Sequence, residues 1–213
     1  MRYLWFVSYC VLLASCTSRF AFDKYPESKK MTDNKTINLF WKSDSTNKTS
    51  IKFLANTTIY GKEIKGILIL RKMSDTLYKA TFLAQGAAKL FDMEILPDTF
   101  ISHYSIEQLN KQAVLRTLAN DIRLITIGCH QALLIESTRQ SSTGEIAQVR
   151  SKNGFRYYIQ DAESTLLQLI QTNFQNKKDL TITFSTYNNE IPHTIILKHH
   201  RFRMQIDLSL MLD

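Results

Sequence analysis

The chain has 213 residues, 44% of them hydrophobic, and carries 27 Lys and Arg against 19 Asp and Glu, for a net charge of +8. This length fits a single domain. Three cysteines are too few for a disulfide framework, so a hydrophobic core must hold the fold. No stretch beyond the N-terminal run approaches the roughly 18 apolar residues of a membrane helix.

The N-terminus has the pattern of an export signal. Arg2 precedes an apolar run over residues 3–13 that is too short to span a bilayer. The run ends in Leu13, Ala14, Ser15 and Cys16, which resembles the lipobox of bacterial lipoproteins. The resemblance implies cleavage before Cys16, diacylation of its thiol and acylation of the new amine, and roughly 0.8 kcal/mol per buried methylene makes such an anchor stable. The alternative is an ordinary signal peptide with an incidental cysteine.

The domain boundaries follow from this signal. We expect a signal peptide at 1–15, a lipidated tether at 16–35, where the sequence is polar and aperiodic, and one domain at 36–213. No Asp follows Cys16, and by the conventions of bacterial lipoproteins this indicates the outer membrane, facing the periplasm. Cys129 is then left alone and is interpreted as a small buried hydrophobe rather than a nucleophile.

The positive charges are scattered along the chain. Pairs such as Lys29 with Lys30, Lys177 with Lys178, and Arg201 with Arg203 are interpreted mainly as a solvated surface, with proximity to an anionic membrane as the second interpretation. Nucleic acid is not an expected partner of an exported lipoprotein.

A period of two in hydrophobicity runs from residue 51 to residue 106. It is typical of half-buried antiparallel strands, and short connectors with Gly, Ser or Asp join the segments as hairpins. We expect strands at 51–59, 63–72, 78–82, 91–95 and 100–106.

The pattern then changes to a helical one. Leu115, Leu118, Ile122 and Ile125 are spaced by three, four and three residues, which predicts one amphipathic helix over 106–124. Gly128 is a plausible stop signal.

Strand character returns after the helix. The Asn153-Gly154 pair between segments 145–150 and 155–158 is the strongest hairpin signal in the chain. Residues 165–172 fit a helix or a strand, and we favour a strand because 177–187 alternates directly afterwards. With further segments at 131–137, 194–198 and 202–210, about ten strands and one helix predict a mainly β (α+β) fold, an antiparallel sheet curled around one core.

Residue patterns for catalysis or metal binding are missing from the sequence. It contains neither a Gly-rich phosphate loop nor a G-x-S-x-G elbow. Asp92 and Glu94 share a strand face, which a solvated outer surface explains better than acid–base work. His199 and His200 are neighbours whose side chains diverge on a strand, which suits joint metal binding poorly. We therefore expect a protein that is not an enzyme and holds no metal or cofactor.

The order of these segments carries a family resemblance. Its points are the hairpin from Ile51 to Lys72, the segment Leu77 to Leu83 with its Gly turn and the strand from Lys89 to Glu94, the helix that follows, and the closing hairpin from Ile191 to Leu208. Together they resemble LolB and the LolA/LolB-like lipoprotein-localisation family, and the chain is also similar to small lipoproteins of Bacteroidota. The resemblance implies an open antiparallel β half-barrel with helices over an apolar cavity.

The implied cavity accepts acyl chains by non-directional burial, worth roughly 25 cal/mol per Å². The residues expected to line it are Phe53, Leu68, Tyr78, Phe82, Phe91, Met93, Phe202, Met204 and Ile206. The alternative is that the same side chains fill a closed core. In LolB the turn after the third strand exposes a bulky apolar residue ahead of its Gly. The matching membrane-facing loop here has Leu83, Gln85 and Gly86, so Gln85 departs from the pattern.

Two functions remain open at this point. The first is an outer-membrane-anchored periplasmic receptor that binds the acyl chains of lipoproteins or lipids, takes them from a LolA-like carrier, acts as a monomer and inserts lipoproteins into the membrane. The second is a structural or accessory lipoprotein of an outer-membrane assembly. An open apolar cavity of several hundred Å³ favours the first, and a packed interior with an exposed apolar patch favours the second.

Overall fold

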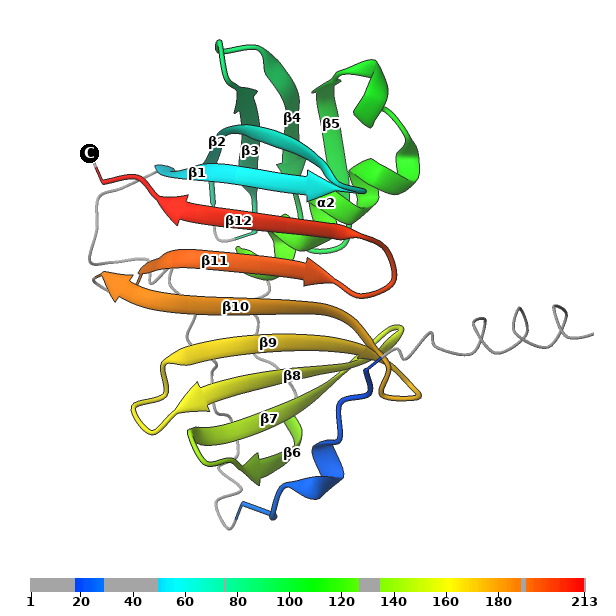
Figure 1. The fold of residues 1–213 in the computed structure, drawn as a ribbon, viewed down its shortest axis with the longest axis vertical. Coiled ribbons are helices and arrows are strands. Elements are labelled where there is room, and N and C mark those ends of the chain that lie inside the picture. Colours follow the sequence, from blue (N-terminus) through cyan, green and yellow to red (C-terminus); the bar gives the residue numbers. More distant parts are fainter. Residues whose placement is uncertain (1–17, 29–49, 75, 127–134, 189–190, 213) are drawn as a thin grey trace, which may run out of the picture.

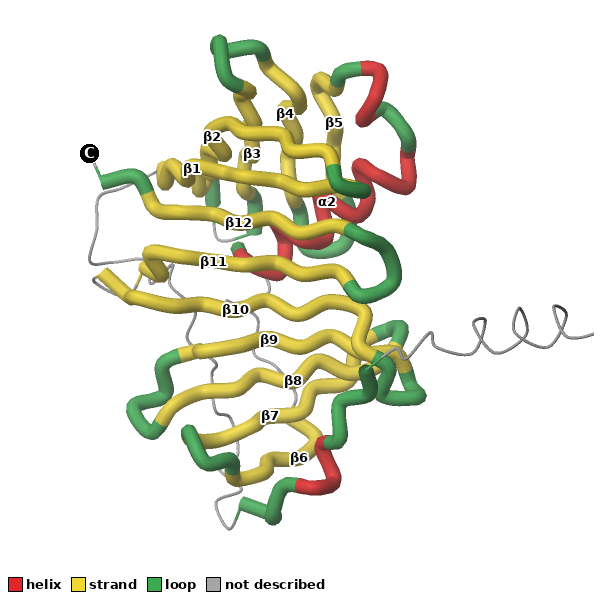
Figure 2. The backbone as a smooth tube through the Cα atoms, viewed as in Figure 1, coloured by secondary structure: helices red, strands yellow, loops and turns green. Residues whose placement is uncertain are grey.

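A single open sheet of twelve antiparallel strands forms most of the molecule (Figure 1). The computed structural model describes residues 18–28, 50–74, 76–126, 135–188 and 191–212. The lipobox with Cys16, the lone Cys129 and the start of the segment expected at 131–137 lie outside the described residues. Figure 2 shows how little of the described chain is helical or loop.

Most of the described chain is in strands, and its helical segments are short. The strands in chain order are β1 (Ser50–Ile59), β2 (Lys62–Lys72), β3 (Tyr78–Ala84), β4 (Lys89–Ile95), β5 (Phe100–Ser105), β6 (Ile135–Gln140), β7 (Gly144–Ser151), β8 (Gly154–Asp161), β9 (Leu166–Asn173), β10 (Lys178–Asn188), β11 (Ile191–His199) and β12 (Met204–Leu210). The helices are η2 (Phe22–Lys24), η3 (Glu107–Leu109) and α2 (Gln112–Ile125).

The strand order is β5-β4-β3-β2-β1-β12-β11-β10-β9-β8-β7-β6, so β5 and β6 are the two edges and the half-barrel is open between them. Every pairing follows the chain except β1 with β12, which joins the two halves. Neighbouring strands twist by roughly 20–25°. Because β4 and β8 are eight places apart, the accumulated twist brings the β4–β5 turn towards the β7–β8 turn across the concave face.

One face of the sheet carries the core. Alternate residues of each strand point to this concave face, beginning with Ile51, Phe53 and Ala55 on β1, and they form one apolar cluster with the buried side of α2. Figure 1 shows α2 behind β1 and β12, on the face that the sheet curls around. The helix buries its predicted stripe of Leu115, Leu118 and Ile122 there.

Two glycines explain local details of the sheet. In the β1–β2 turn, Tyr60 and Gly61 both have positive φ, 48° and 82°, which is the geometry of a tight hairpin turn that matches strand twist. The Asn153-Gly154 hairpin forms as predicted, but Gly154 is the first residue of β8 rather than a turn residue. A Cβ there would lie 2.0 Å from the carbonyl oxygen of Thr172, so the close approach of β9 requires glycine.

The structure corrects the predicted tether. Over residues 18–28 the chain packs on the convex face of β7, β8 and β9, where Phe20 and Phe22 are buried against Tyr157 and Ile170. Backbone bonds fix both ends of this segment: Lys178 N donates to the Ser18 carbonyl (3.2 Å), and Gln140 N to that of Pro26 (2.9 Å). The polar composition misled because two aromatic residues are sufficient to bury a short segment.

The remaining predictions hold in outline. The sheet has twelve strands rather than about ten, and residues 166–173 form a strand. The single helix predicted over 106–124 is divided into η3 and α2 by Asn110 and Lys111, and α2 begins at Gln112. Phe202 lies in the β11–β12 loop, not in the last strand. Among the described residues, none of the helices is long and apolar enough to cross a membrane.

Candidate ligand-binding site

An apolar cavity lies between α2 and the concave face of the sheet. Its walls come from β1–β4, β11, β12, η3 and α2, and its volume is about 50 Å³. The lining residues are Ala55, Thr57, Ile59, Ile64, Leu68, Phe82, Leu90, Phe91, Leu109, Leu118, Asp121, Ile122, Ile125, Leu197, Ile206 and Leu208. Only Thr57 and Asp121 among them are polar, so the cavity favours hydrocarbon over water.

The predicted cavity residues fall into three groups. Leu68, Phe82, Phe91 and Ile206 line the cavity. Four others are buried in the surrounding core without lining the cavity, namely Phe53, Tyr78, Met93 and Met204. Phe202 is half-buried in its loop, where its ring stacks on that of His199 with the centroids 4.5 Å apart.

The cavity is much smaller than the several hundred Å³ that a small-molecule site occupies. The part of the concave face under the apolar side of α2 is therefore closed in this conformation. A chain of more than a few carbons fits only if the helix moves away from the sheet.

A buried polar pair ties α2 to the sheet at the rim of this cavity. His199 Nε2, at the end of β11, lies 2.9 Å from Asp121 Oδ2 on α2, and both side chains are almost completely buried. Burial raises the pKa of Asp121, against the hydrogen bond and charge of His199, which lower it. Such a pair stabilises one helix position specifically, because separating the partners leaves two buried polar groups unpaired.

A second polar tie holds the other side of α2. Arg123 donates from Nε to the Leu96 carbonyl and from Nη2 to the Thr99 carbonyl, both at 2.7 Å. These carbonyls belong to the β4–β5 turn. The helix is thus fastened at two points by hydrogen bonds, in addition to the burial of its apolar stripe against the sheet.

The Asp121–His199 pair also separates the cavity from the outside. His199 lines a surface groove of about 630 Å³ between the β1–β2 turn and the β11–β12 loop, together with Tyr60, Arg201 and Arg203. The loop and turn are bound to each other, since Tyr60 N donates to the Arg203 carbonyl at 2.8 Å. A route from the cavity to this groove passes the buried pair.

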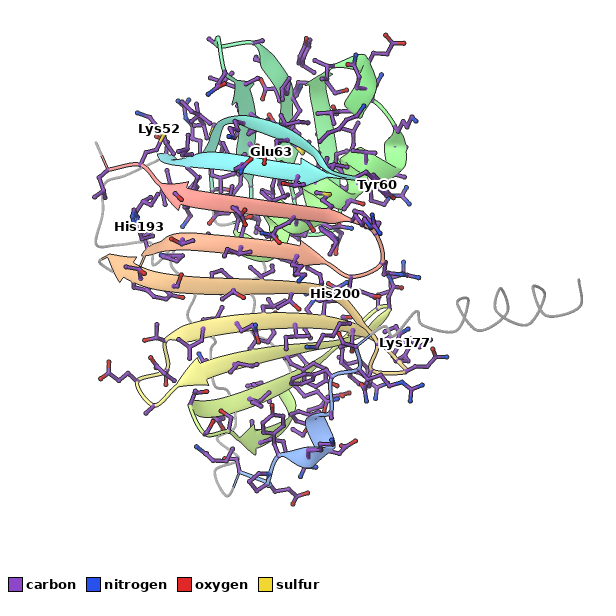
Figure 3. The ribbon with its side chains drawn as sticks, viewed as in Figure 1. Lys52, Tyr60, Glu63, Lys177, His193 and His200 are labelled. Carbon is purple, nitrogen blue, oxygen red and sulfur yellow. The ribbon has the colours of Figure 1, made fainter. Side chains whose placement is uncertain are left out.

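The groove lies at one end of the strands. The turns at this end form a rim of the sheet with a positive charge, called the basic edge below. Because neighbouring strands are antiparallel, the β1–β2, β3–β4, β7–β8, β9–β10 and β11–β12 turns share this edge, and Figure 3 shows Tyr60, His200 and Lys177 along it. Their residues 60–61, 85–88, 152–153, 174–177 and 200–203 include Lys152, Lys177, Arg201 and Arg203 and no acidic residue. The described turn residues of the opposite edge include Asp98 and Glu163 and no basic one.

The predicted membrane-facing loop lies on the same basic edge. Gln85 and Gly86 are exposed at the tip of the β3–β4 turn. Leu83 is half-buried within β3 and pairs with Ile67 of β2, so it does not project from the turn. The most exposed aromatic residues of the edge are instead Tyr60 and Phe174, at 69% and 56%.

The two acidic residues of β4 form ion pairs, and Asp92 is buried, at 7% exposed, rather than solvated as expected. Asp92 lies 3.1 Å from Lys89 Nζ and 3.5 Å from Lys79 Nζ, and Glu94 lies 3.1 Å from His103. Burial raises the pKa of Asp92, but the two lysines outweigh it and the pKa is lowered. Within the described residues there is no group of three His, Cys, Asp or Glu side chains that could hold a metal ion.

Sequence reasoning missed both polar ties, although the two residues of the Asp121–His199 pair each left a signal. Asp121 interrupts the apolar stripe of α2, three residues after Leu118 and four before Ile125. His199 continues the inward alternation of Ile195 and Leu197. A charged residue inside an apolar face requires a partner, and each of these residues is the other's.

Comparison with known proteins gives a likeness of fold. None of the known family models matches the sequence, and no curated protein matches it. A LolA superfamily protein from Nitrosomonas europaea superposes with a TM-score of 0.50 at 8% identity, covering 76% of this chain and 83% of that one. A domain described as an outer membrane lipoprotein-sorting protein from Vibrio parahaemolyticus gives 0.43 at 8%, covering 76% and 83%.

A third solved structure, a DUF1329 family protein from Desulfovibrio piger, gives a TM-score of 0.48 at 7% identity and covers 78% of this chain and 85% of that one. Such identities bear on the fold alone. The chain folds as an open antiparallel β half-barrel with one main helix, similar to a LolA superfamily protein.

Proposed function

We propose that this protein is an outer-membrane lipoprotein that faces the periplasm, binds acylated ligands between α2 and the concave sheet, and delivers lipoproteins to the membrane. The observation that carries the proposal is the almost wholly apolar cavity under a helix held by two polar ties. Opening the helix would expose the apolar concave face, and each methylene buried there contributes roughly 0.8 kcal/mol. Transfer needs no catalytic residue, only a difference in affinity between donor and acceptor.

The basic edge supports a defined orientation at the membrane. Its turns carry only positive charges, which anionic headgroups attract, and Tyr60 and Phe174 are exposed aromatic side chains suited to the interface. Ser18 is bonded to Lys178 at the start of β10, on this edge. Cys16 precedes Ser18 by two residues in the sequence, and a lipid on Cys16 is proposed to enter the bilayer beside the same turns.

Filling the cavity tests acyl binding. Ala55, on its floor, is 2% exposed, and Ala55→Leu would add three carbons where an acyl chain would start. We expect about tenfold weaker binding of a fluorescent fatty acid, because two lost methylene contacts are worth about 1.6 kcal/mol. Ala84→Leu, half-buried at the end of β3 and outside the cavity, is the matched control. Equal affinity of both variants and the wild type would contradict the proposal.

The second function, an accessory subunit of an outer-membrane assembly, is favoured by one observation, the small volume of the closed cavity. Depletion followed by membrane fractionation separates the two. The carrier predicts that other lipoproteins accumulate at the inner membrane. The accessory subunit predicts that they reach the outer membrane normally.

A further inference from the structure

A second cleft lies on the side of α2 that faces away from the apolar cavity. Its volume is about 810 Å³, and small-molecule sites occupy about 300–1,000 Å³. The walls are the β4–β5 turn, the outward face of α2, the β7–β8 turn and the concave face of β8 and β9. The charged residues of its lining are Asp98, Arg116, Arg123, Lys152 and Arg156.

The cleft carries an excess of positive charge. Arg116, Arg123, Lys152 and Arg156 line it against one acid, Asp98. Within the part of the chain that the structure describes, Arg116, Lys152 and Arg156 form no ion pair. Three unneutralised cations around one concave space attract an anion from solution.

Arg156 is the residue that marks the cleft as a binding site. It lies on the concave face of β8, in register with Val149 and Gln171, two residues from the fully buried Tyr158. Its Nε is buried and has no hydrogen-bond acceptor among the described residues. A guanidinium nitrogen withdrawn from water without an acceptor is costly, and a ligand that draws the Arg156 side chain into the cleft would remove that cost.

Arg139 on the same sheet also has a buried Nε without a hydrogen-bond acceptor among the described residues, but the rest of its guanidinium is engaged. Its guanidinium lies 3.4 Å from the Glu27 carboxylate, donates to the Tyr25 carbonyl and stacks over the ring of Phe22. Arg156 has no comparable set of contacts.

Arg123 holds a second positive charge towards Arg156. Its hydrogen bonds to Leu96, Thr99 and Asn120 fix the guanidinium in place. Burial lowers the pKa of Arg123, Asp98 raises it, and the like charge of Arg156 lowers it further. Two arginines kept close together without a shared carboxylate are arranged for an anion that both can approach.

We propose that this cleft binds a phosphate group, with Arg156 as the principal ligand and Arg123, Arg116 and Lys152 supplying charge. A phosphate offers more acceptor oxygens and more negative charge than a carboxylate, which matches four cations and one acid. The amides of Asn120, Asn153 and Gln171 add neutral donors around the same space. This site goes beyond acyl binding, because helix α2 separates it from the apolar cavity.

Calorimetric titration of the purified protein at low salt tests the site with three probes. They are inorganic phosphate, glycerol 3-phosphate, and dihexanoylphosphatidylglycerol below its micellar concentration. We expect Arg156→Gln to lower the affinity for each probe about tenfold or more, the loss typical of one charge-assisted contact. Arg150→Gln is the matched control, because it removes the same charge from the exposed face of neighbouring β7, where Arg150 pairs with Glu136.

Thermal unfolding gives an independent readout of folding. Without phosphate, Arg156→Gln should unfold at the wild-type temperature or above it, because the variant no longer buries an unpaired guanidinium. With phosphate, the wild type and Arg150→Gln should be stabilised and Arg156→Gln should not.

The source of the phosphate follows from the three probes. Tighter binding of the phospholipid than of glycerol 3-phosphate assigns a lipid headgroup. Equal affinities assign a soluble phosphate. Failure of every probe to bind, or equal weakening by Arg156→Gln and Arg150→Gln, would overturn the site. Loss of fatty-acid binding alone would overturn the acyl proposal and leave the phosphate result intact.

Discussion

At the residue scale, the Asp121–His199 pair controls how firmly α2 sits on the sheet. Each partner is buried and has the other at 2.9 Å. Because burial raises the pKa of Asp121, the folded protein holds this proton more tightly than the unfolded chain. The contribution of the group to stability is therefore fully present below the unfolded pKa of 3.8 and is lost as the pH rises through the raised value.

Unfolding of Asp121→Asn at a series of pH values tests the predicted direction of this pH dependence. Asn keeps the shape and a hydrogen bond to His199 but does not titrate. The free energy of unfolding of the wild type minus that of Asp121→Asn should fall as the pH rises above about 4, measured by urea denaturation. The same subtraction for Ala113→Ser, an exposed position of α2 where neither residue titrates, should stay flat. A rising or flat difference for Asp121 would contradict a raised pKa in the folded protein.

At the element scale, the segment of residues 18–28 is part of the folded domain. Phe22 is 4% exposed, and the centroid of its ring lies 5.0 Å from that of Tyr157. The guanidinium of Arg139 lies over the Phe22 ring. The segment also bonds to edge strand β6, which protects that edge from pairing with another chain.

Truncation of Phe22 measures this packing. Phe22→Ala should lower the free energy of unfolding by about 3 kcal/mol, the cost of a buried Phe-to-Ala change. Ala21→Ser, at an exposed neighbour, should change it by less than about 0.5 kcal/mol. If the segment were a free tether, the two variants would unfold alike in urea.

The sequence predicted most strands because alternation records which face of a sheet is buried. It also predicted α2 from the spacing of Leu115, Leu118 and Ile122. It did not predict the burial of Phe20 and Phe22, which depends on an apolar patch around Tyr157 on the convex face of a distant hairpin. The basic cleft was equally hidden, because Arg156 and Arg123 meet only through the accumulated twist of the sheet.

At the scale of the whole molecule, the two sheet edges differ in charge. The turns beside the groove are basic and those opposite are acidic. The proposed orientation at an anionic surface would turn the groove of Tyr60 and His199 towards the bilayer, next to the Asp121–His199 pair.

Co-sedimentation with phosphatidylglycerol vesicles tests this orientation. In a Cys16→Ser background, so that a lipid anchor does not hide the effect, we expect binding that weakens as salt rises. Replacing Tyr60 and Phe174 by Ser should reduce it severalfold. Tyr104→Ser, which removes a 46% exposed tyrosine from edge strand β5, should leave it unchanged. An equal loss of vesicle binding in the Tyr60 and Phe174 variant and in Tyr104→Ser would contradict binding through the basic edge.

The proposed carrier function depends above all on acyl chains occupying the space between α2 and the concave sheet. Photo-crosslinking with a triacylated lipopeptide that carries a diazirine in one acyl chain, followed by peptide mapping, locates those chains directly. We expect labels on the cavity-lining residues of β1, β2, β3 and α2, among them Leu68, Phe82 and Leu118, and their loss in Ala55→Leu. Labels confined to the convex face, or no labelling at all, would contradict acyl binding at this site.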